Sequence, residues 1–412
     1  MSADKIRAIL ESGADIEDAV LASDDKAIFY HLSPLRANLL SWIDFKEDAS
    51  VLEINAECGA LTGILCEKAK HVTAVDASKD NCEINAHRNK YENLELITGE
   101  FKKIKFTKTF NYITIVGLQE KLLKKTISKA ATLLAPGGQL ILAGEGDIKQ
   151  ADKYLAKAGF KETKTYYPAP DYRIPLEIRT DKDVGSFLIF AKRDGTCDRE
   201  VSYVKFACQR KPEFRVSTKI TEENGTKRVI KSPMTEAAKE HIARLASNKD
   251  KVAGMYKGIT PADCKLEGDS AVFPFIEGEI LTIEDLDKVF DYNEPLAAFE
   301  VTDRFREIFG DIDVPEGEQS YPVTNIDSNL DNFMSTDGKT YCIDYEWIFD
   351  FPVPVRFVRY RTLFYAGISP DKFADYGYLE EDIKFFHNME IAFQQYVSGD
   401  DFKYIMASRL QS

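Results

Sequence analysis

The stretch VLEINAECGALTGILCEKAKHVTAVDAS, residues 51–78, decides the fold of the first part of the chain. An apolar run, 51–54, enters a turn at 55–59, after which apolar residues recur at helical spacing. A second apolar run ends on Asp76, 23 residues after Glu53. The pattern predicts a βαβ unit in which the helix N-terminus faces a ligand and the acidic side chain can bind a ribose.

The residues of this unit resemble motif I of class I S-adenosylmethionine-dependent methyltransferases, in which a strand ending in an acid leads into G-x-G-x-G. Gly59 is the glycine that this chain keeps, and Asn55 and Glu57 stand at the first two positions. Asparagine tolerates a left-handed turn better than other non-glycine residues. Glu57 adds a carboxylate near the methionine carboxylate of the cofactor. The resemblance implies a site for S-adenosylmethionine, which the two replacements could weaken.

The same resemblance implies which residues hold the cofactor. For the segment before the first strand, a lip over the cofactor and ordinary packing or capping are equally good interpretations. The implied residues are Tyr30 and Ser33 in that segment, Glu53, Asn55, Ala56 and Gly59 at the first turn, Asp76 and Ala77 after the second strand, Glu100 and Phe101 beside the adenine, and Gly117 after the fourth strand.

Further apolar runs extend the sheet. They predict a Rossmann-like, doubly wound α/β sheet with strands at 94–98, 112–116, 134–144 and 186–192, capped by helices at 4–21 and 26–43. A polar turn follows the last run. We therefore expect capping helices in residues 1–48, the methyltransferase domain in 49–194 and a second domain in 195–412.

Two absences concern the methyl acceptor. No N-P-P-Y or D-P-P-Y sequence follows the fourth strand, so support for methylation of base or glutamine amino groups is missing. Residues 144–147 lead almost directly into a helix predicted at 150–158, which leaves little room for an acceptor. Tyr166, Tyr167 and Tyr172 either line the acceptor pocket or pack against the sheet edge, and we favour packing.

The second half changes character. Alternating residues predict antiparallel strands at 201–207, 214–220 and 228–231 with a hairpin turn at 223–226, followed by a helix at 235–247. Three motifs then resemble aminoglycoside phosphotransferases and protein kinases: VIK at 229–231, FPFIEGEIL at 273–281, and NIDSNLDNF with YCIDYEW at 325–347. The last pair resembles H-x-D-x-x-x-x-N followed by an apolar strand that ends in Asp.

This resemblance implies an ATP and Mg²⁺ site. Asp327 would accept the proton of the acceptor hydroxyl, Asn332 and Asp344 would hold Mg²⁺, and Lys231 would orient the phosphates, with Glu236 and Glu240 on the helix beside it. The chain departs from the pattern at Asn325, where a histidine is usual, and at CQRKPEF, residues 208–214, where no glycine-rich loop appears. A pseudokinase is the competing interpretation.

Composition excludes several classes of protein. The chain has 412 residues, which favours two or three domains, and no apolar run long enough to cross a membrane. The net charge of −14 argues against nucleic acid as the main partner. Seven scattered cysteines without a C-x-x-C pair fit reduced thiols and offer no zinc site. The acidic N-terminus is unlike a signal peptide, so we expect a cytoplasmic protein.

The order of the two halves resembles bifunctional enzymes of bacterial surface-polysaccharide synthesis. We therefore expect a methyltransferase, acting on a hydroxyl of a glycan or small molecule, fused to a kinase-like domain. One alternative is a degenerate methyltransferase domain that serves as a scaffold. Another is a kinase for which the first domain is a sensor. The sequence leaves the acceptor and the oligomeric state open.

Overall fold

The computed structural model describes residues 2–181, 184–195 and 200–399, and these form two compact units, residues 2–206 and 207–399. The first unit extends past residue 194 because strand β9 (Glu200–Phe206) pairs with β7 (Glu177–Arg179). The division into domains at 194 stays a prediction. No helix in the described part of the chain is long and apolar enough to cross a membrane.

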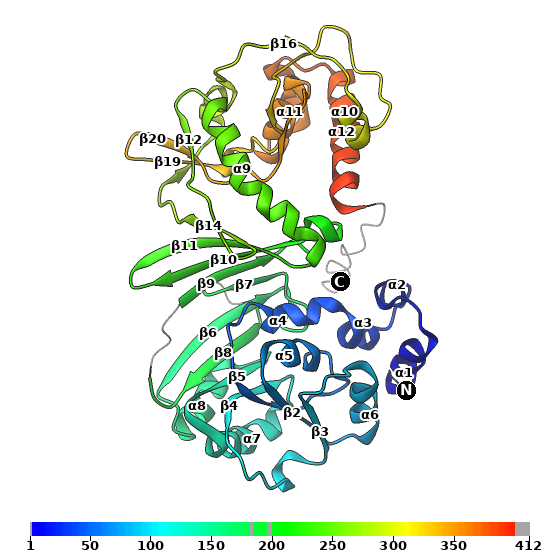
Figure 1. Ribbon diagram of the computed structural model, residues 1–412, viewed down its shortest axis with the longest axis vertical. Coiled ribbons are helices and arrows are strands. Elements are labelled where there is room, and N and C mark those ends of the chain that lie inside the picture. Colours follow the sequence, from blue (N-terminus) through cyan, green and yellow to red (C-terminus); the bar gives the residue numbers. More distant parts are fainter. Residues whose placement is uncertain (1, 182–183, 196–199, 400–412) are drawn as a thin grey trace. The chain divides into compact units, whose positions relative to one another are not determined.

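The first unit is built on one twisted sheet with the strand order β9-β7-β6-β8-β5-β4-β1-β2-β3 (Figure 1). The strands from β3 to β5 are parallel, and β8, β6, β7 and β9 continue the sheet in antiparallel pairs. The predicted Rossmann-like sheet is therefore confirmed. The remaining strands are β1 (Ser50–Ile54), β2 (His71–Asp76), β3 (Leu94–Thr98), β4 (Phe110–Val116), β5 (Leu134–Glu145), β6 (Glu162–Ala169) and β8 (Ser186–Lys192).

Alternation along β1 sends successive side chains to opposite faces of the sheet. Leu52 and Ile54 join the apolar core with residues of α7 (Glu120–Leu133) and α8 (Ile148–Lys157), whereas Glu53 faces α5 (Thr62–Lys68). Helix α6 (Lys79–Arg88) lies on the same side as α5, since Asn85 also bonds Thr62. The chain reverses its strand order between β1 and β4, which is where open α/β sheets bind ligands.

The N-terminal helices are shorter than predicted. The expected helix 4–21 is divided into α1 (Ser2–Ser12) and α2 (Ile16–Leu21), because Gly13 has a φ of 69° and Asp15 caps α2. The expected helix 26–43 is divided into α3 (Lys26–Leu32), a 3₁₀ turn η1 (Pro34–Ala37) and α4 (Asn38–Ser41). Helix α3 ends at Leu32 with Ser33 as its C-cap, because Pro34 has no backbone N–H to continue the helical hydrogen bonds.

The second unit begins with an antiparallel sheet of order β13-β14-β11-β10. Its strands are β10 (Val216–Glu223), β11 (Thr226–Pro233), β13 (Lys265–Glu267) and β14 (Ser270–Pro274). The predicted hairpin is confirmed, with Asn224 and Gly225 at positive φ in its turn. The predicted helix 235–247 begins as a 3₁₀ turn, η4 (Glu236–Ala238), and continues as α9 (Lys239–Met255).

A smaller sheet and a helical part complete this unit. The sheet has the order β12-β20-β19-β15, and helix α10 lies between β15 and β19 in the chain, whereas α11 and α12 follow β20. The bounds are β12 (Ile259–Pro261), β15 (Glu279–Ile280), β16 (Ala297–Ala298), β17 (Gln319–Ser320), β18 (Thr324–Asn325), β19 (Phe333–Thr336), β20 (Lys339–Cys342), β21 (Ile348–Phe349), α10 (Asp303–Phe309), α11 (Val355–Tyr365) and α12 (Glu380–Ser398), with 3₁₀ turns η2 (Phe101–Lys103) in the first unit and η3 (Pro212–Phe214), η5 (Ile283–Phe290), η6 (Leu330–Asn332) and η7 (Pro370–Tyr376) in the second.

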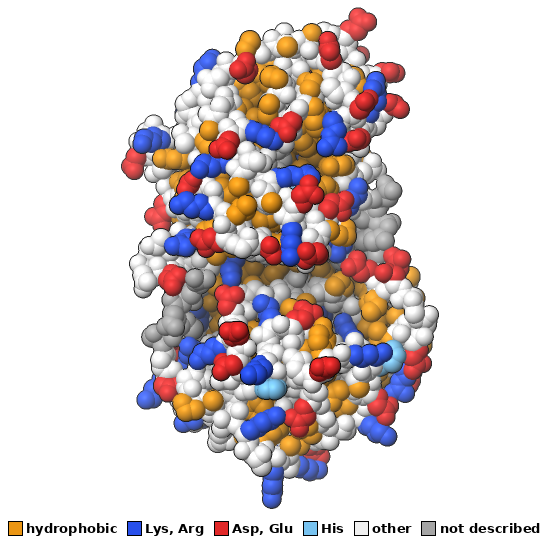
Figure 2. All heavy atoms as spheres, in the orientation of Figure 1, with side chains coloured by type: hydrophobic (Ala, Val, Ile, Leu, Met, Phe, Trp, Pro, Cys, Tyr) orange, Lys and Arg blue, Asp and Glu red, His pale blue; other side chains and the backbone are white. Residues whose placement is uncertain are grey.

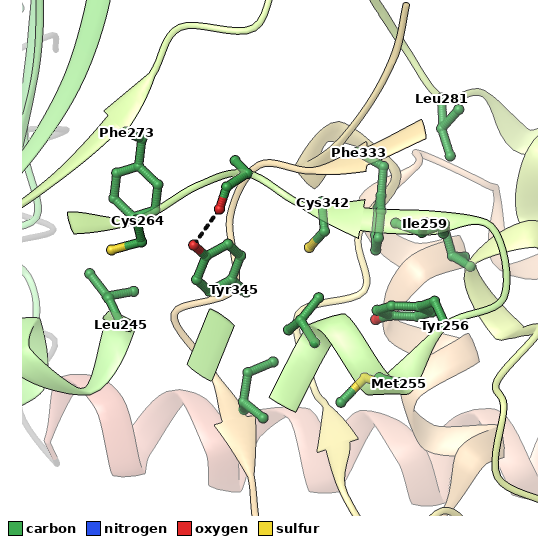
Figure 3. Close-up of a cluster of buried hydrophobic side chains, with 14 of the residues drawn as sticks. Leu245, Met255, Tyr256, Ile259, Cys264, Phe273, Leu281, Phe333, Cys342 and Tyr345 are labelled. Carbon is green, nitrogen blue, oxygen red and sulfur yellow. Dashed lines mark hydrogen bonds between the residues drawn. The ribbon is translucent and has the colours of Figure 1, made fainter. Parts of the chain in front are cut away.

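Two apolar cores stabilise the second unit. One joins α9 to both sheets and is shown in Figure 3, where the hydroxyl of Tyr345 donates a hydrogen bond of 2.7 Å to the carbonyl of Ala262. Tyr345 is completely buried and follows Asp344 directly, so this core fixes the segment that carries Asp344. The other core is rich in aromatic residues and joins α10, α11 and α12.

Candidate functional site

The turn after β1 has the backbone conformation that three glycines would supply. Asn55, Glu57 and Gly59 have φ angles of 66°, 49° and 76°. The amides of Asn55 and Ala56 donate to the carbonyl of Val75, at 3.0 and 3.1 Å, and the Asn55 side chain donates to the carbonyl of Val116 at 3.0 Å. Asn55 therefore ties the turn to β2 and β4. Glu57 adopts a conformation that costs a non-glycine residue about 1–2 kcal/mol.

Gly59 is required by a close approach as well as by its φ angle. A Cβ atom at this position would lie 2.4 Å from Oδ1 of Asn85 and 2.5 Å from Nδ2 of Asn89. Asn89 also donates to the carbonyl of Gly59 at 2.9 Å. The turn is thus held against α6 with no room for a side chain.

Asp76 is buried at the end of β2, and hydrogen bonds fix its carboxylate. Its Oδ2 atom accepts from the amide of Glu57 at 3.0 Å. Its Oδ1 atom accepts from the amide of Ser78 at 2.8 Å and from the side chain of Asn81 at 3.1 Å. The exposed Ala77 lies between Asp76 and α6. Asp76 therefore connects the turn after β1 to the start of α6.

Glu53 lies beneath the turn in a buried polar network. Its Oε2 atom accepts a hydrogen bond of 2.6 Å from the Thr62 hydroxyl, which accepts one of 2.9 Å from Asn85. Burial raises the pKa of Glu53 to about 8, although the Thr62 hydrogen bond opposes that shift. The structure thus connects Glu53 to α5 and α6, so its visible role is to position the turn.

The segment before β1 brings an unsatisfied cation to the turn. Arg36 is 5% exposed, and its Nε and Nη1 atoms have no hydrogen-bond partner. Its Nη2 atom lies 4.0 Å from Oε2 of Glu57, and Nδ1 of His31 lies 3.7 Å from the same oxygen. Burial lowers the pKa of Arg36 and of His31 below their usual values, while Glu57 opposes both shifts. The sequence had drawn attention to this segment, but Arg36 was not among the residues predicted to hold the cofactor.

Ser33 and Tyr30 are the residues of this segment that the resemblance implies for cofactor binding, and the structure shows contacts of both with protein groups. The hydroxyl of the buried Ser33 accepts from the amide of Leu35 at 3.3 Å, which caps η1. The ring of Tyr30 lies beneath the guanidinium of Arg173, 5.2 Å from its centroid. The structure thus brings Tyr30, but not Ser33, toward residues at the end of β5.

Glu100 and Phe101 follow β3 as predicted. Glu100 has its partners within its own segment, whereas Phe101 contacts a lysine of α7. Glu100 pairs with Lys102 at 2.7 Å and with Lys103, and these contacts lower its pKa to about 2. Phe101 is half-buried and lies beneath the ammonium of Lys129, 4.7 Å from the ring centroid. One face of the Phe101 ring is therefore covered by a cation.

A cavity of about 280 Å³ lies where β4 and β5 end, and its lining includes Gly117, Glu145, Gln150, Tyr172 and Arg173. Arg173 donates to both oxygens of Glu145, at 3.2 and 3.0 Å, and lies over the Tyr172 ring. Burial raises the pKa of Tyr172 to about 12.

We predicted that Tyr166, Tyr167 and Tyr172 pack against the sheet edge. The contact between Tyr166 and Trp42, whose ring centroids are 5.1 Å apart, agrees with this prediction. For Tyr172 the structure corrects it, because this side chain lines the cavity. The prediction failed there because its loop folds back over the end of β4, where the Tyr172 hydroxyl lies 3.1 Å from the position of a Cβ on Gly117.

In the second unit, Lys231 and Asp344 meet although 113 residues separate them. The Lys231 ammonium lies 2.6 Å from Asp344 and 3.4 Å from Glu346. Burial alone would lower the pKa of Lys231, but the two carboxylates raise it above its usual value. Glu236 and Glu240 do not approach Lys231. Both are exposed, and they pair with Lys239 and Arg244.

Asp327 and Asn332 lie close together in space in the segment that follows β18. The Asn332 side chain donates to the carbonyl of Asp327 at 2.9 Å, and the carboxylate of Asp327 lies 3.2 Å from Arg361. Burial raises the pKa of Asp327, and Arg361 opposes the shift. The amide of Ile343 donates to the carbonyl of Asn332 at 2.8 Å, which brings this loop beside Asp344.

The described residues contain no group of three or more His, Cys, Asp or Glu side chains arranged to hold a metal. The six cysteines that the structure describes are free and buried, and Cys197 lies outside the described residues. Neither finding identifies a zinc site within that part of the chain.

Comparison with known proteins finds similarity to methyltransferases in the first unit. Residues 51–138 match the family described as "Methyltransferase domain". The chain is 27% identical over 183 residues to the ribosomal RNA small subunit methyltransferase A of Malacoplasma penetrans, covering 44% of this chain and 62% of that protein. It thus spans less than two thirds of that relative's length.

Solved structures of methyltransferases are similar at low identity. A TehB-like S-adenosylmethionine-dependent methyltransferase from Corynebacterium glutamicum is 14% identical, with a TM-score of 0.34 over 46% of this chain and 95% of that one. The N-methyltransferase NodS from Bradyrhizobium japonicum is 17% identical, with a TM-score of 0.31 over 43% and 97%. With the family match and the order of β1 to β5, the first unit contains a class I S-adenosylmethionine-dependent methyltransferase domain.

Proposed function

We propose that the chain transfers a methyl group from S-adenosylmethionine to a hydroxyl of a small molecule or glycan, and that its second unit is a kinase-like domain. The observation that carries the first part is the turn after β1. All three positions at which the family has glycine adopt left-handed conformations, and the amide of Glu57 bonds Asp76. The turn keeps the shape of a cofactor loop despite Asn55 and Glu57.

The residues around this turn fit the chemical groups of the cofactor. A carboxylate has about four acceptor positions, and the hydrogen bonds to Asp76 use three of them. One position is left for a ribose hydroxyl. The Nε and Nη1 atoms of Arg36 are buried donors without partners, which suits the methionine carboxylate. When bound, the cofactor supplies an electrophilic methyl group on its sulfonium.

The acceptor cavity supports a small acceptor. Its volume of about 280 Å³ is at or below the low end of ordinary ligand pockets, about 300–1,000 Å³. Such a space suits a small molecule or the terminal sugar of a glycan. Arg173 lowers the pKa of Glu145, so this carboxylate can accept a hydrogen bond from a hydroxyl but is a weak base. The enzyme would then act mainly by aligning the hydroxyl oxygen with the methyl group.

A ribosomal RNA acceptor, which the curated relative's name suggests, fits this chain less well. The net charge is −14, whereas phosphate binding needs a surplus of Lys and Arg on one face. Figure 2 shows Lys and Arg side chains interspersed with Asp and Glu over the face that it draws. The charge distribution on that face therefore favours an uncharged or small acceptor.

The contacts of the second unit support ATP and Mg²⁺ as its ligands. Lys231 is buried beside Asp344, and Asn332 lies next to Asp327. These are the residue types and the neighbours that phosphoryl transfer uses. Arg361 engages the Asp327 carboxylate, which supports the alternative of a domain that binds nucleotide without turning it over.

Methyl transfer is tested with S-adenosylmethionine labelled in the methyl group and a panel of sugars, glycans, small alcohols and ribosomal RNA. The proposal expects label in a hydroxyl-bearing small molecule or glycan. It also expects less transfer in Tyr172→Ala, which opens the acceptor cavity, than in Tyr154→Ala, which removes a half-buried tyrosine of α8 that does not line the cavity. Label that appears only in RNA would contradict the acceptor class and leave the methyltransferase standing.

The kinase-like part is tested by ATP hydrolysis and phosphate transfer with the wild type and Asp327→Asn. Turnover that the substitution abolishes would support a kinase. Binding of Mg²⁺-ATP without turnover in either protein would support the alternative in which this unit is a scaffold or sensor.

A further inference from the structure

Glu346 is a buried acid of the second unit with three side-chain partners, and the kinase-like motifs do not use it. Its side chain is 5% exposed. One oxygen accepts from Nε2 of His241 at 2.6 Å and pairs with Nη1 of Arg210, and the other lies 3.4 Å from the ammonium of Lys231. Three cationic or donor side chains from separate segments thus converge on one carboxylate.

We propose that Glu346 positions Lys231 for nucleotide phosphates from one side, while Asp344 lies 2.6 Å from the same ammonium. This inference rests on the proposed nucleotide site of the second unit. A glutamate on the helix would be the partner in the resembled families, but here the helix offers His241 on its buried side. His241 reaches Lys231 only through Glu346.

The electrostatics of the cluster fit such a role. An isolated buried carboxylate is unfavourable, and it stays ionised only when it is paired and hydrogen-bonded. Burial would raise the pKa of Glu346, but Arg210, Lys231 and His241 outweigh it and hold that pKa well below the usual range. The Glu346 carboxylate is itself fixed by His241 and Arg210, so it can hold the Lys231 ammonium in place.

Glu346 comes from the same segment as Asp344, the proposed metal ligand. Glu346 lies two residues after Asp344, and its amide donates to the Asp344 carboxylate at 3.3 Å. The segment that carries both acids is fixed by the buried Tyr345 between them and by Asn248 of α9, which donates to the carbonyls of Tyr345 and Glu346. Lys231 is thus tied to the segment of the proposed metal ligand, and its pairing does not depend on a glutamate of α9.

Arg210, which pairs with Glu346, comes from the segment between β9 and β10. It belongs to CQRKPEF, which stands where a glycine-rich loop was expected, and it also lies over the ring of Trp347 at 5.7 Å. This segment therefore supports the lysine through Glu346.

The test compares Glu346→Gln with Glu240→Gln in the full chain. Glu240 is the control because it is an exposed glutamate of α9 that pairs with Arg244. Calorimetric titration with Mg²⁺-ATP measures affinity. The rate of Lys231 acetylation by acetic anhydride at one fixed pH, read by mass spectrometry, measures how firmly the lysine is held. The second measurement needs no nucleotide.

We expect Glu346→Gln to weaken Mg²⁺-ATP binding about tenfold and to speed Lys231 acetylation several-fold, with Glu240→Gln unchanged in both. If Glu346→Gln does not fold, Glu346→Asp keeps the charge and should give a smaller change in the same direction. Equal effects of the two glutamine variants, or an unchanged Lys231 in Glu346→Gln, would overturn the inference while wild-type ATP binding stands. Absence of ATP binding by folded wild type would instead overturn the nucleotide site and this inference with it.

Discussion

The Nη2 atom of Arg36 lies 4.0 Å from Oε2 of Glu57, while the other two nitrogens of the same guanidinium have no hydrogen-bond partner. The carboxylate that replaces the second glycine of the loop is thus faced by a buried cation from the segment before β1. Arg36 can offset the charge of Glu57 and still offer donors to a second anion. The departure from the glycine pattern and the arginine are best understood together.

The first prediction concerns this pair. Hydrogen bonds to charged groups contribute about 1.5–3 kcal/mol, so Arg36→Gln is expected to weaken S-adenosylhomocysteine binding at least about tenfold. Glu57→Gln is expected to strengthen it, because a carboxylate that repels the ligand carboxylate is removed. Calorimetric titration measures both effects.

The matched ligand is 5′-methylthioadenosine, which keeps the nucleoside and lacks the amino-acid part. Its affinity should be nearly the same in wild type, Arg36→Gln and Glu57→Gln. If Arg36→Gln weakened both ligands equally, Arg36 would have a structural role in place of a role in binding the carboxylate.

The second prediction concerns Gly59. Alanine there adds a Cβ only 2.4 Å from Asn85 in addition to the cost of a left-handed φ. We expect Gly59→Ala to lower the free energy of unfolding by about 3 kcal/mol and to abolish cofactor binding. Gly137 is the matched control, because its φ of 68° is similar and no atom lies within 4 Å of its Cβ position.

Gly137→Ala is expected to cost only the left-handed conformation, about 1 kcal/mol, and to leave binding intact. Urea denaturation of the two variants measures the difference. Equal destabilisation would mean that the packing of the turn against α6 is not what requires glycine at residue 59.

The third prediction concerns pH. The pKa of Glu53 is raised from 4.5 to about 8 in the folded chain, so the folded state holds a proton that the unfolded state releases near pH 4.5. The stabilisation from this group is fully present below pH 4.5 and is lost as the pH rises toward 8. Glu53→Gln keeps a hydrogen-bond acceptor for Thr62 and removes the titration.

We expect the free energy of unfolding to fall between pH 5 and 8 by at least about 1 kcal/mol more in wild type than in Glu53→Gln. Chemical denaturation at several pH values measures it. Parallel pH profiles for the two proteins would show that the Glu53 carboxyl titrates at its ordinary pKa.

Local patterns in the sequence were enough to predict the first βαβ unit. The apolar runs around Asn55 and Asp76 alternate as strands do, and the φ angle of Asn55 is the one that its residue type favours. The break at Gly13 and the stop at Ser33 were missed because the apolar spacing continues across both. Capping and proline chemistry, which act on the backbone, ended those helices.

The site residues that were missed depend on contacts between distant segments. Arg36 becomes notable only because folding buries it beside Glu57, and nothing in its neighbours in the sequence indicates burial. Glu346 follows Asp344 in a familiar motif, yet its link to Lys231 spans 115 residues. Glu236 and Glu240 were chosen by their place after VIK, and the direction that the helix gives them could not be read from spacing alone.

The measurement that tests the central claim most directly is calorimetric titration of the purified chain with S-adenosylmethionine, repeated on Asp76→Ala. The account predicts saturable binding by the wild type with one site per chain, and loss of at least about tenfold in affinity in Asp76→Ala because a charged ribose acceptor is removed. Circular dichroism of both proteins confirms that they are folded. No binding by folded wild-type protein would contradict the account, and the turn after β1 would then be a retained structural element of a domain without its cofactor.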